Sequence, residues 1–566
     1  MRDKVRALIA ESGFFVSSTM KVFVHQHGAL LYEAKSLEDL HSYMVHLTTP
    51  ATEYDFHTTP YEHQREIFEQ SKDRKNFALL MEMGTGKTKV AIDTAAYLYE
   101  FGKIKNVIVF APNGVHRNWI QEVRIHMPPR IPRVRGYWDS KAKKKDREEF
   151  EEVLQREGLI KIVAFNIESI LTKKVQEIVN ALIKEPTLLI IDESTRIKNP
   201  DAKRTKLLIE LGTQVEYKRI LTGTPVTQSP LDLFSQFGFL DKKILGFSSF
   251  IAFRNRYAEY HNPALLRELV RVAGPDGATI YQQRQRAFVS NEFLYRLGIR
   301  DIRGIQIILR TTPIYVRNYK NMEELHGMIE PHSSRVLKKD CLDLPEKLYI
   351  PRSVKMSVEQ ARTYESVKTL LRAELEGQEM NITHTLTKLL RLQQICGGFF
   401  QGDGQEEPQP LNKKNPKIEA LKEIIEDIGE DKQVIIWARF IPEIKAIEDA
   451  LENTVTYYGA TSSEDRVKAI EDFQAGEKRI FIGNQSAAGI GITLTAASYV
   501  IYFSNSFSLE DRLQSEDRAH RIGQRENVTY IDLIMENTID QKVTGALRDK
   551  KSIADLITQD GIGEIL

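Results

Sequence analysis

Four aliphatic residues followed at once by two acids are the feature that most constrains the fold of this chain. The run Leu-Leu-Ile-Ile at residues 188–191 leads directly into Asp192 and Glu193. An unbroken apolar run is typical of a strand buried on both faces of a parallel sheet, and such sheets bind ligands at the carboxyl ends of their strands. Asp192 could therefore hold Mg²⁺ beside a phosphate, and Glu193 could accept a proton from an attacking water. The alternative interpretation is a strand that ends in a solvated acidic turn.

A glycine-rich loop precedes this strand in the sequence. An apolar run at residues 77–81 leads into it, and a helical pattern follows it. The loop contains Gly84, Thr85, Gly86, Lys87 and Thr88. Its glycines let backbone N–H groups close around phosphate oxygens, the lysine can reach the β- and γ-phosphates, and the Thr88 hydroxyl can bind Mg²⁺. Met81 stands where the strict phosphate-loop pattern has glycine, but strand, loop, helix and acidic pair together predict a nucleotide site.

Length and composition limit the number of domains, the kind of partner and the cellular compartment that this chain can have. The chain has 566 residues, too many for one core, so several domains are expected. The formal net charge is +1, so any nucleic-acid surface must be local. Cys341 and Cys396 lack metal-ligand spacing, which fits a reducing, cytoplasmic compartment. No signal peptide and no long apolar run is found in the sequence, so membrane insertion is not expected.

Alternating strand and helix patterns divide the chain into an α/β protein with two doubly wound parallel-sheet lobes. We expect a small N-terminal accessory α/β unit at 1–58, a first, nucleotide-binding lobe at 59–240, helical insertions and a linker at 241–412, a second lobe at 413–540, and a C-terminal brace helix at 541–566. Besides the two runs above, strands are predicted at 21–25, 29–32, 106–112, 161–166, 219–225, 433–437, 455–458, 479–483, 499–503 and 528–533. Short helices are predicted at 5–9 and 37–47.

The second lobe has no phosphate loop, but it carries a segment rich in arginine at residues 511–524. If this segment is helical, Arg518 and Arg521 share one face, with Gln514 one turn earlier. Two guanidinium groups presented together can stabilise charge on a transferring γ-phosphoryl group. The alternative is a solvated helix in which Glu516 and Asp517 pair with those arginines.

In their order along residues 59–540, these motifs resemble the Snf2 family of superfamily 2 helicase-like ATPases. The matching segments are 81–88, 110–119, 192–193, 221–237, 390–396, 487–494 and 514–524. Two departures are visible. Ser194 and Thr195 stand where the family commonly has a small residue and histidine. Neither position is the expected metal ligand or the expected base, so the change concerns the coupling of hydrolysis to DNA. Residues 61–64 read Tyr-Glu-His-Gln, so His63 is the expected stacking ring where the family more often has tyrosine directly before glutamine.

The resemblance implies two RecA-like lobes with ATP and Mg²⁺ in the cleft and DNA across both lobes. Gln64 would read adenine, Lys87 and Thr88 would bind phosphate and Mg²⁺, and Asp192 and Glu193 would coordinate the metal and activate water. Arg518 and Arg521 would be arginine fingers, with Gln514 near the γ-phosphate. Gly84, Thr85, Gly86 and Gly491 complete the expected nucleotide contacts. The expected DNA contacts are Arg117, Asn118, Thr222, Thr224 and Ser486, of which the two threonines would also couple nucleotide state to DNA.

We therefore predict an ATP-dependent translocase on duplex DNA that acts as a monomer with little sequence preference and strong salt sensitivity. Its expected task is remodelling branched or forked DNA or displacing bound proteins, in a bacterial or phage-infected cell. Residues 1–58 would select the substrate or serve as a packing appendage. Two alternatives stay open, namely a strand-separating DNA or RNA helicase and a nucleotide-gated interaction protein without significant hydrolysis.

Overall fold

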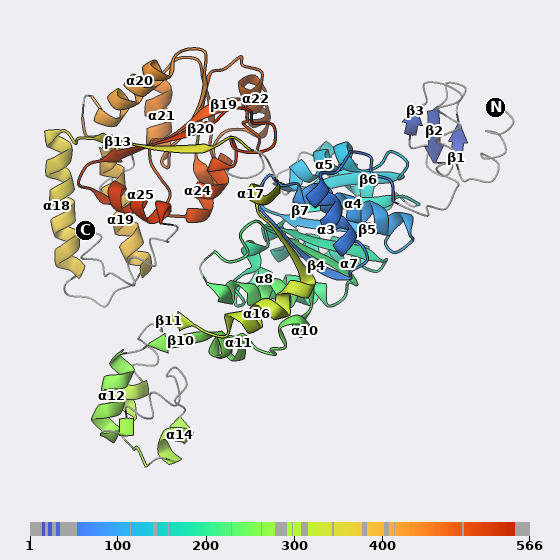
Figure 1. Cartoon of the computed structure of the whole chain (residues 1–566), viewed down its shortest axis with the longest axis horizontal. Coiled ribbons are helices and arrows are strands. Elements are labelled where there is room, and N and C mark those ends of the chain that lie inside the picture. The colour runs from blue at the N-terminus through green and yellow to red at the C-terminus, as the bar shows by residue number, and fades with distance from the viewer. Residues whose placement is uncertain are drawn as a thin grey trace.

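The structure is a computed structural model, shown in Figure 1. It describes residues 14–16, 21–24, 30–33, 54–113, 115–139, 144–156, 158–227, 229–261, 263–274, 276–277, 291–296, 298–300, 302–306, 315–341, 344–375, 382–400, 407–412, 414–488 and 492–549. Within these ranges, no helix is long and apolar enough to cross a membrane.

The first lobe is built on a seven-stranded parallel sheet in the order β12-β4-β9-β8-β5-β7-β6. Its strands are β4 (Asn76–Met81), β5 (Asn106–Ala111), β6 (Arg133–Trp138), β7 (Ile160–Asn166), β8 (Thr187–Asp192), β9 (Tyr217–Leu221) and β12 (Ser333–Val336). The acidic strand β8 lies at the centre of the sheet and is buried along its whole length, as its apolar run predicts. This burial is why the two acids emerge at the sheet's carboxyl edge.

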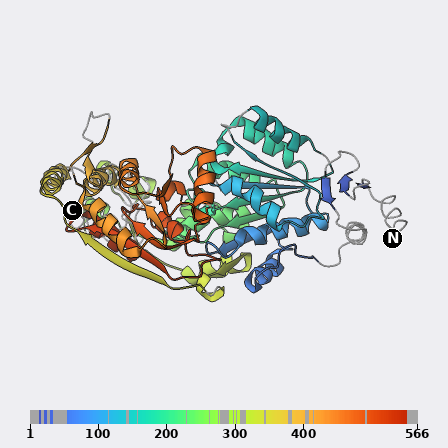
Figure 2. The same ribbon diagram turned by 90° about the horizontal axis from the view of Figure 1, so that it is seen from above.

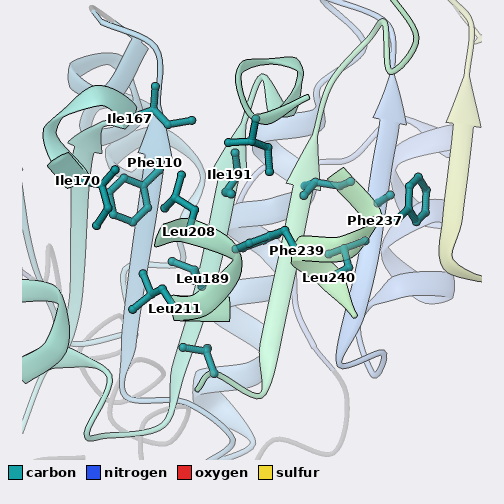
Figure 3. Packing of buried hydrophobic residues seen from close by; sticks show 14 of the residues in the cluster. Phe110, Ile167, Ile170, Leu189, Ile191, Leu208, Leu211, Phe237, Phe239 and Leu240 are labelled. Atoms are coloured by element: carbon teal, nitrogen blue, oxygen red, sulfur yellow. The ribbon is translucent and has the colours of Figure 1, made fainter. Parts of the chain in front are cut away.

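Alternate residues of β8 face opposite layers of helices, as the period of two of a strand requires. Leu188 and Ile190 pack with α3 (Glu62–Ser71), α4 (Lys87–Glu100) and α5 (Val115–His126). Leu189 and Ile191 pack with α7 (Lys173–Leu182), α8 (Lys203–Gly212) and α9 (Leu233–Leu240). Figure 3 shows the second layer, in which Leu189, Ile191, Leu208 and Phe239 lie together. The sheet is thus doubly wound, as predicted.

The second lobe has a six-stranded parallel sheet in the order β13-β20-β19-β16-β18-β17. The strands are β13 (Lys347–Val354), β16 (Gln433–Trp437), β17 (Thr454–Tyr457), β18 (Ile480–Gly483), β19 (Ala497–Tyr502) and β20 (Val528–Met535). One face packs against α19 (Ile382–Cys396), α20 (Pro416–Ile428), α21 (Ile441–Ala450) and α25 (Ile539–Arg548), and the other against α22 (Ser463–Gln474) and the segment around Leu494. The predicted α/β class with two parallel-sheet lobes is confirmed. Figure 2 views the two lobes from above.

Residues 241–412 do more than insert helices, which corrects our prediction for this range. They supply β12 to the first sheet and β13 to the second, and the short helix α17 (Lys338–Cys341) lies between the two strands. Both strands are edge strands in which most residues are at least partly exposed, so they lack the apolar pattern that marks a central strand. They also place the connection between the lobes next to the phosphate loop.

The rest of this range forms a separate projection. The antiparallel pair β10 (Ala258–His261) and β11 (Tyr315–Tyr319) carries α12 (Pro263–Ala273) and α14 (Asn291–Arg296) away from the first lobe, as Figure 1 shows. Leu265, Leu269 and Leu294 belong to a small core of their own there. The remaining helices are α6 (Lys144–Gln155), α10 (Lys242–Leu245), α11 (Phe250–Tyr257), α16 (Met322–Ile329), α18 (Val358–Leu375), α23 (Gln485–Ala488) and α24 (Leu509–Glu516). A short antiparallel pair joins β14 (Phe399–Phe400) to β15 (Gln409–Pro410).

The N-terminal unit contains a three-stranded antiparallel sheet of β1 (Phe14–Val16), β2 (Lys21–Val24) and β3 (Leu30–Glu33). The two predicted strands are confirmed, and β1 is an addition to them. The helices predicted at 5–9 and 37–47 lie outside the described residues. At the other end α25 begins at Ile539 and Asp549 caps it, and the predicted brace beyond that point also lies outside the described part of the chain.

Candidate active site between the two lobes

A cavity of about 440 Å³ joins the two lobes at the glycine-rich loop. Its walls include most of the predicted nucleotide residues, namely Gln64, Gly84, Gly86, Lys87, Thr88, Asp192 and Glu193 from the first lobe and Gln514, Arg518 and Arg521 from the second. Thr85 is buried beside this wall, and Gly491 lies outside the described residues. The sequence motifs, far apart along the chain, thus meet in one place.

The loop has the backbone that a phosphate site needs. Gly84 and Gly86 have φ angles of +83° and +90°, which side-chain-bearing residues rarely adopt. A Cβ atom on Gly86 would lie 2.1 Å from Gln64 Nε2, so the close approach also requires glycine. Because α4 begins at Lys87, the first N–H groups of that helix have no intrahelical acceptor and stand at the loop, where they suit phosphate oxygens.

Gln64 is held by the backbone on both sides. Its Nε2 donates to the carbonyl of Thr85 (3.0 Å), and its Oε1 accepts from the backbone N–H of Tyr61 (3.1 Å). His63 contacts the same Thr85 carbonyl (2.8 Å) and is buried. Of these two rings, Tyr61 lines the cavity; it is 49% exposed and stacks on His63, with ring centroids 5.9 Å apart. Tyr61 is therefore a better candidate than His63 for stacking on a base. The order of residues along the chain does not show which of the two rings lines the cavity.

The acidic pair stands at the end of β8. Trp119 Nε1 donates to one oxygen of Asp192 (2.8 Å), and the backbone N–H of Glu193 donates to the other (3.0 Å). Burial, and next the negative charge of Glu193, raise the pKa of Asp192 to about 6. Glu193 itself has a φ of +50°, an uncommon conformation for a residue other than glycine, and Lys87 Nζ lies 3.2 Å from its carboxylate. The acids thus form a buried anionic site rather than a solvated turn.

This anionic site fits Mg²⁺. Thr88 and Asp192 line the cavity and offer hard oxygen ligands, and Mg²⁺ in nucleotide sites commonly uses one or two protein oxygens with phosphates and waters. A divalent cation would also offset the repulsion between the two carboxylates that contributes to the raised pKa of Asp192. Among the described residues there is no group of three or more His, Cys, Asp or Glu side chains suited to a metal, so a protein-only metal cage is not built there.

The arginines come from a turn and not from a helix, contrary to the helical arrangement considered above. The helix α24 ends at Glu516, and Arg518 and Arg521 follow it. Arg518 is buried, donates to the carbonyls of Gln514 (3.1 Å) and Ile492 (3.0 Å), and contacts Met83 Sδ across the lobes (2.9 Å). Burial, followed by the charge of Arg521, lowers the pKa of Arg518 to about 10, so the guanidinium is charged at neutral pH.

The acids of this segment pair with other cations. Glu516 lies 2.8 Å from Arg512, and Asp517 lies 2.6 Å from Lys338. The alternative in which these acids pair with Arg518 and Arg521 is therefore not what the structure shows. This outcome depends on Lys338, which is far away in the sequence.

The expected DNA contacts are dispersed. Arg117 is paired with Asp139, and Asn118 lines the cavity between the lobes. Thr222 is fully buried and its hydroxyl donates to Glu193 (3.3 Å), which favours a coupling role over a direct contact. Thr224 lines a second cavity, of about 640 Å³, next to the first, and Ser486 is exposed and donates to Asn484.

The segment just after the acidic pair, Ser194 to Arg196, makes contacts that its sequence does not predict. Arg196, which was not predicted from the sequence, lines the cavity between the lobes. Ser194 is buried and donates to Gln236 of α9 (2.6 Å), so it is integrated into the first lobe. The Thr195 hydroxyl lies 3.5 Å from Glu510 of the second lobe. Of the two departures from the family pattern, Ser194 therefore packs within the first lobe, and Thr195 faces the second lobe.

Comparison with known proteins matches two domain families along the chain. The SNF2-related domain matches residues 43–398, and the Helicase conserved C-terminal domain matches residues 416–523. An ISWI chromatin-remodeling complex ATPase of Saccharomyces cerevisiae is 24% identical over 84% of this chain and 38% of its own length. An uncharacterized ATP-dependent helicase of Mycoplasma genitalium is 25% identical over 83% of this chain and 39% of its own length.

This chain therefore spans about two-fifths of the length of these curated relatives. One solved structure, the Sulfolobus solfataricus SWI2/SNF2 ATPase core in complex with dsDNA, is 23% identical and covers 91% of this chain and 97% of that one, with a TM-score of 0.38. Because the SNF2-related domain alone accounts for more than half of the chain, this protein belongs to the SNF2-related family of helicase-like ATPases.

Proposed function

We propose that this chain hydrolyses ATP with Mg²⁺ in the cavity between its lobes and uses the energy to move along duplex DNA. The observation that carries the proposal is the meeting of Lys87, Asp192 and Glu193 from one lobe with Arg518 and Arg521 from the other. A site divided in this way can act as a switch, because its parts work together only while the lobes are closed.

The chain's own groups have distinct roles in the proposed reaction. Lys87 leaves its pair with Glu193 to bind the β- and γ-phosphates, and Glu193 is then available to take a proton from the attacking water. Thr88 and Asp192 would hold Mg²⁺, which neutralises charge on the phosphates. Arg518 exchanges its contact with Met83 for the charge that develops on the γ-phosphoryl group.

Translocation on duplex DNA is the proposed output of this cycle. The family membership and the relatives named as helicases and chromatin-remodelling ATPases support it. Thr222 touches the base Glu193, and Thr195 reaches Glu510 of the other lobe, so hydrolysis has contacts through which it could change a DNA grip. We further propose that the motor remodels branched or forked DNA or displaces bound proteins, with little sequence preference because phosphate contacts carry no sequence information.

The test is ATP hydrolysis without nucleic acid and with single-stranded DNA, duplex DNA, a model fork and RNA at one salt concentration. Stimulation by duplex, and more by the fork, is expected. Stimulation only by single strands or by RNA would replace the translocase with a strand-separating helicase. Absence of hydrolysis under every condition would contradict an ATPase function.

A further inference from the structure

The short helix α17 lies between the lobes and is anchored to the first one (Figure 1). The backbone N–H of Lys338 donates to Glu82 Oε2 (2.7 Å), and the backbone N–H of Glu82 donates to the carbonyl of Val336 (3.0 Å). Glu82 directly follows the strand β4 and precedes the phosphate loop. The position of Lys338 is therefore set by the same turn that begins the nucleotide site.

The side chain of Lys338 reaches in the opposite direction, into the second lobe. Its ammonium lies 2.6 Å from Asp517 Oδ1 and donates to the carbonyl of His520 (3.0 Å). Asp517 directly precedes Arg518, and His520 directly precedes Arg521. One buried cation thus holds the turn of the arginines at two points, each adjacent to a proposed finger.

The three elements are also in close contact. A Cβ atom placed on Gly84 would lie 3.2 Å from Arg521 Cβ and 3.6 Å from Lys338 Cε. The phosphate loop, the linker and the arginine turn therefore touch one another. Lys347 also reaches Glu516 (3.0 Å) and Asp517 (3.4 Å). It belongs to β13, a strand of the second lobe's own sheet, so it braces the turn within the second lobe and does not connect the lobes.

We propose that Lys338 is a positioning residue that sets the arginine turn at its working distance from the phosphate loop. This inference rests on the proposed role of Arg518 and Arg521 at the phosphates. An ion pair inside the protein is weakly screened by salt, and Lys338 also donates to the His520 carbonyl, so it holds the turn at two points where Lys347 holds only the acidic side. Misplacement of a reacting group by about 1 Å can cost about 100-fold in rate, so a residue that never touches the nucleotide can still control turnover.

The test compares Lys338→Met with Lys339→Met in the full chain. Both changes replace a lysine of the same helix by an apolar side chain of similar length, but Lys339 is exposed. With duplex DNA present, Lys338→Met should lower kcat by about 10- to 100-fold while KM for ATP and the Kd of a fluorescent ATP analogue stay within about twofold. Lys339→Met should match the wild type, and Lys338→Arg should recover part of the lost kcat because it restores the charge.

Three outcomes would overturn the proposal. The first is a kcat of Lys338→Met equal to that of Lys339→Met. The second is a loss of kcat in Lys338→Met that comes with a similar fold-loss of nucleotide affinity and with a lowered Tm, which would indicate a structural role. If Lys338→Met does not fold, Asp517→Asn removes the anionic partner instead. The third outcome is a kcat of Asp517→Asn equal to that of the wild type. Failure of the proposed function would look different, because the wild type itself would then show no ATP turnover with duplex DNA.

Discussion

The two lobes share a parallel-sheet architecture but place their charged residues differently. In the first lobe the charged residues Lys87, Asp192 and Glu193 line the cavity at the carboxyl edge. Both lobes also bury charged pairs, but the pair Lys89–Asp93 of the first lobe lies within one helix, α4, whereas the second lobe also has buried pairs that join different elements. Lys417 is fully buried and lies 2.6 Å from Asp540, so it links α20 to α25. Arg512 pairs with Asp532 of β20 and with Glu516.

This difference suggests different roles for the charged residues of the two lobes. Arg512 pairs with Glu516, which directly precedes Asp517 and the turn. The buried pair therefore supports the turn that presents Arg518 and Arg521. In the proposed reaction the first lobe therefore supplies the groups that bind the nucleotide, and the second lobe holds one turn in position. Substitutions should then affect catalysis in the first lobe and stability or geometry in the second, which the following predictions test.

The comparison would fail most clearly if the first lobe's charges were dispensable. Lys87→Ala and Glu193→Gln should each lower kcat for ATP by about 10⁴-fold, because one removes the phosphate cation and the other the base. Glu193→Gln should retain binding of a fluorescent ATP analogue. The control is Glu216→Gln at an exposed position of the same lobe, which should leave kcat unchanged. Substantial turnover by either variant would remove these residues from the site.

The turn of the second lobe should affect rate without affecting binding. Arg518→Lys should lower kcat by about 10³-fold, since lysine lacks the planar fork of an arginine finger, with nucleotide affinity kept within a fewfold range. Arg525→Lys, an exposed position just beyond the turn, is the matched control. Steady-state kinetics with duplex DNA and equilibrium nucleotide binding measure the two quantities. A parallel loss of affinity would mean that Arg518 acts in ground-state binding.

The scaffold of the second lobe should respond in stability. Lys417→Met leaves Asp540 buried without its cation and should destabilise the lobe by about 4 kcal/mol. Lys432→Met breaks the exposed pair with Glu526 (3.0 Å) and should leave stability nearly unchanged, because solvent and salt screen an exposed pair. Hydrogen exchange of β16 and β20 across a denaturant series measures both changes. Equal effects of the two substitutions would contradict a special role for buried charge in this lobe.

The smallest expected effect is a dependence of stability on pH. Burial raises the pKa of Glu443 from its ordinary 4.5 to about 7. Between these values the folded state binds more protons than the unfolded state, so the free energy of unfolding decreases as pH rises, by up to about 3 kcal/mol. Glu443→Gln, which cannot titrate, should flatten this slope between pH 5 and 7 in denaturant unfolding. An unchanged slope would assign the dependence to other groups, such as Asp192 with its raised pKa.

The sequence by itself determined the features that depend on short stretches of chain. The apolar run of β8 and its two acids, the glycine loop before α4, and the central strands of both sheets follow from local pattern, because burial on both faces demands continuous apolar residues. Most of the residues that line the cavity between the lobes were also predicted in this way, since each motif is contiguous. The edge strands β12 and β13 were not, because exposed strands carry no such pattern.

Only the tertiary structure decided which partner each charged group has. Asp517 pairs with Lys338 and not with an arginine beside it in the sequence. The cavity is lined by Tyr61 and not by His63, because His63 turns inward to the Thr85 carbonyl. The helix α24 also ends before the arginines. The physical reason is that a buried charge or polar group takes whichever partner the packed lobes bring within a few ångströms, and chain distance does not enter that choice.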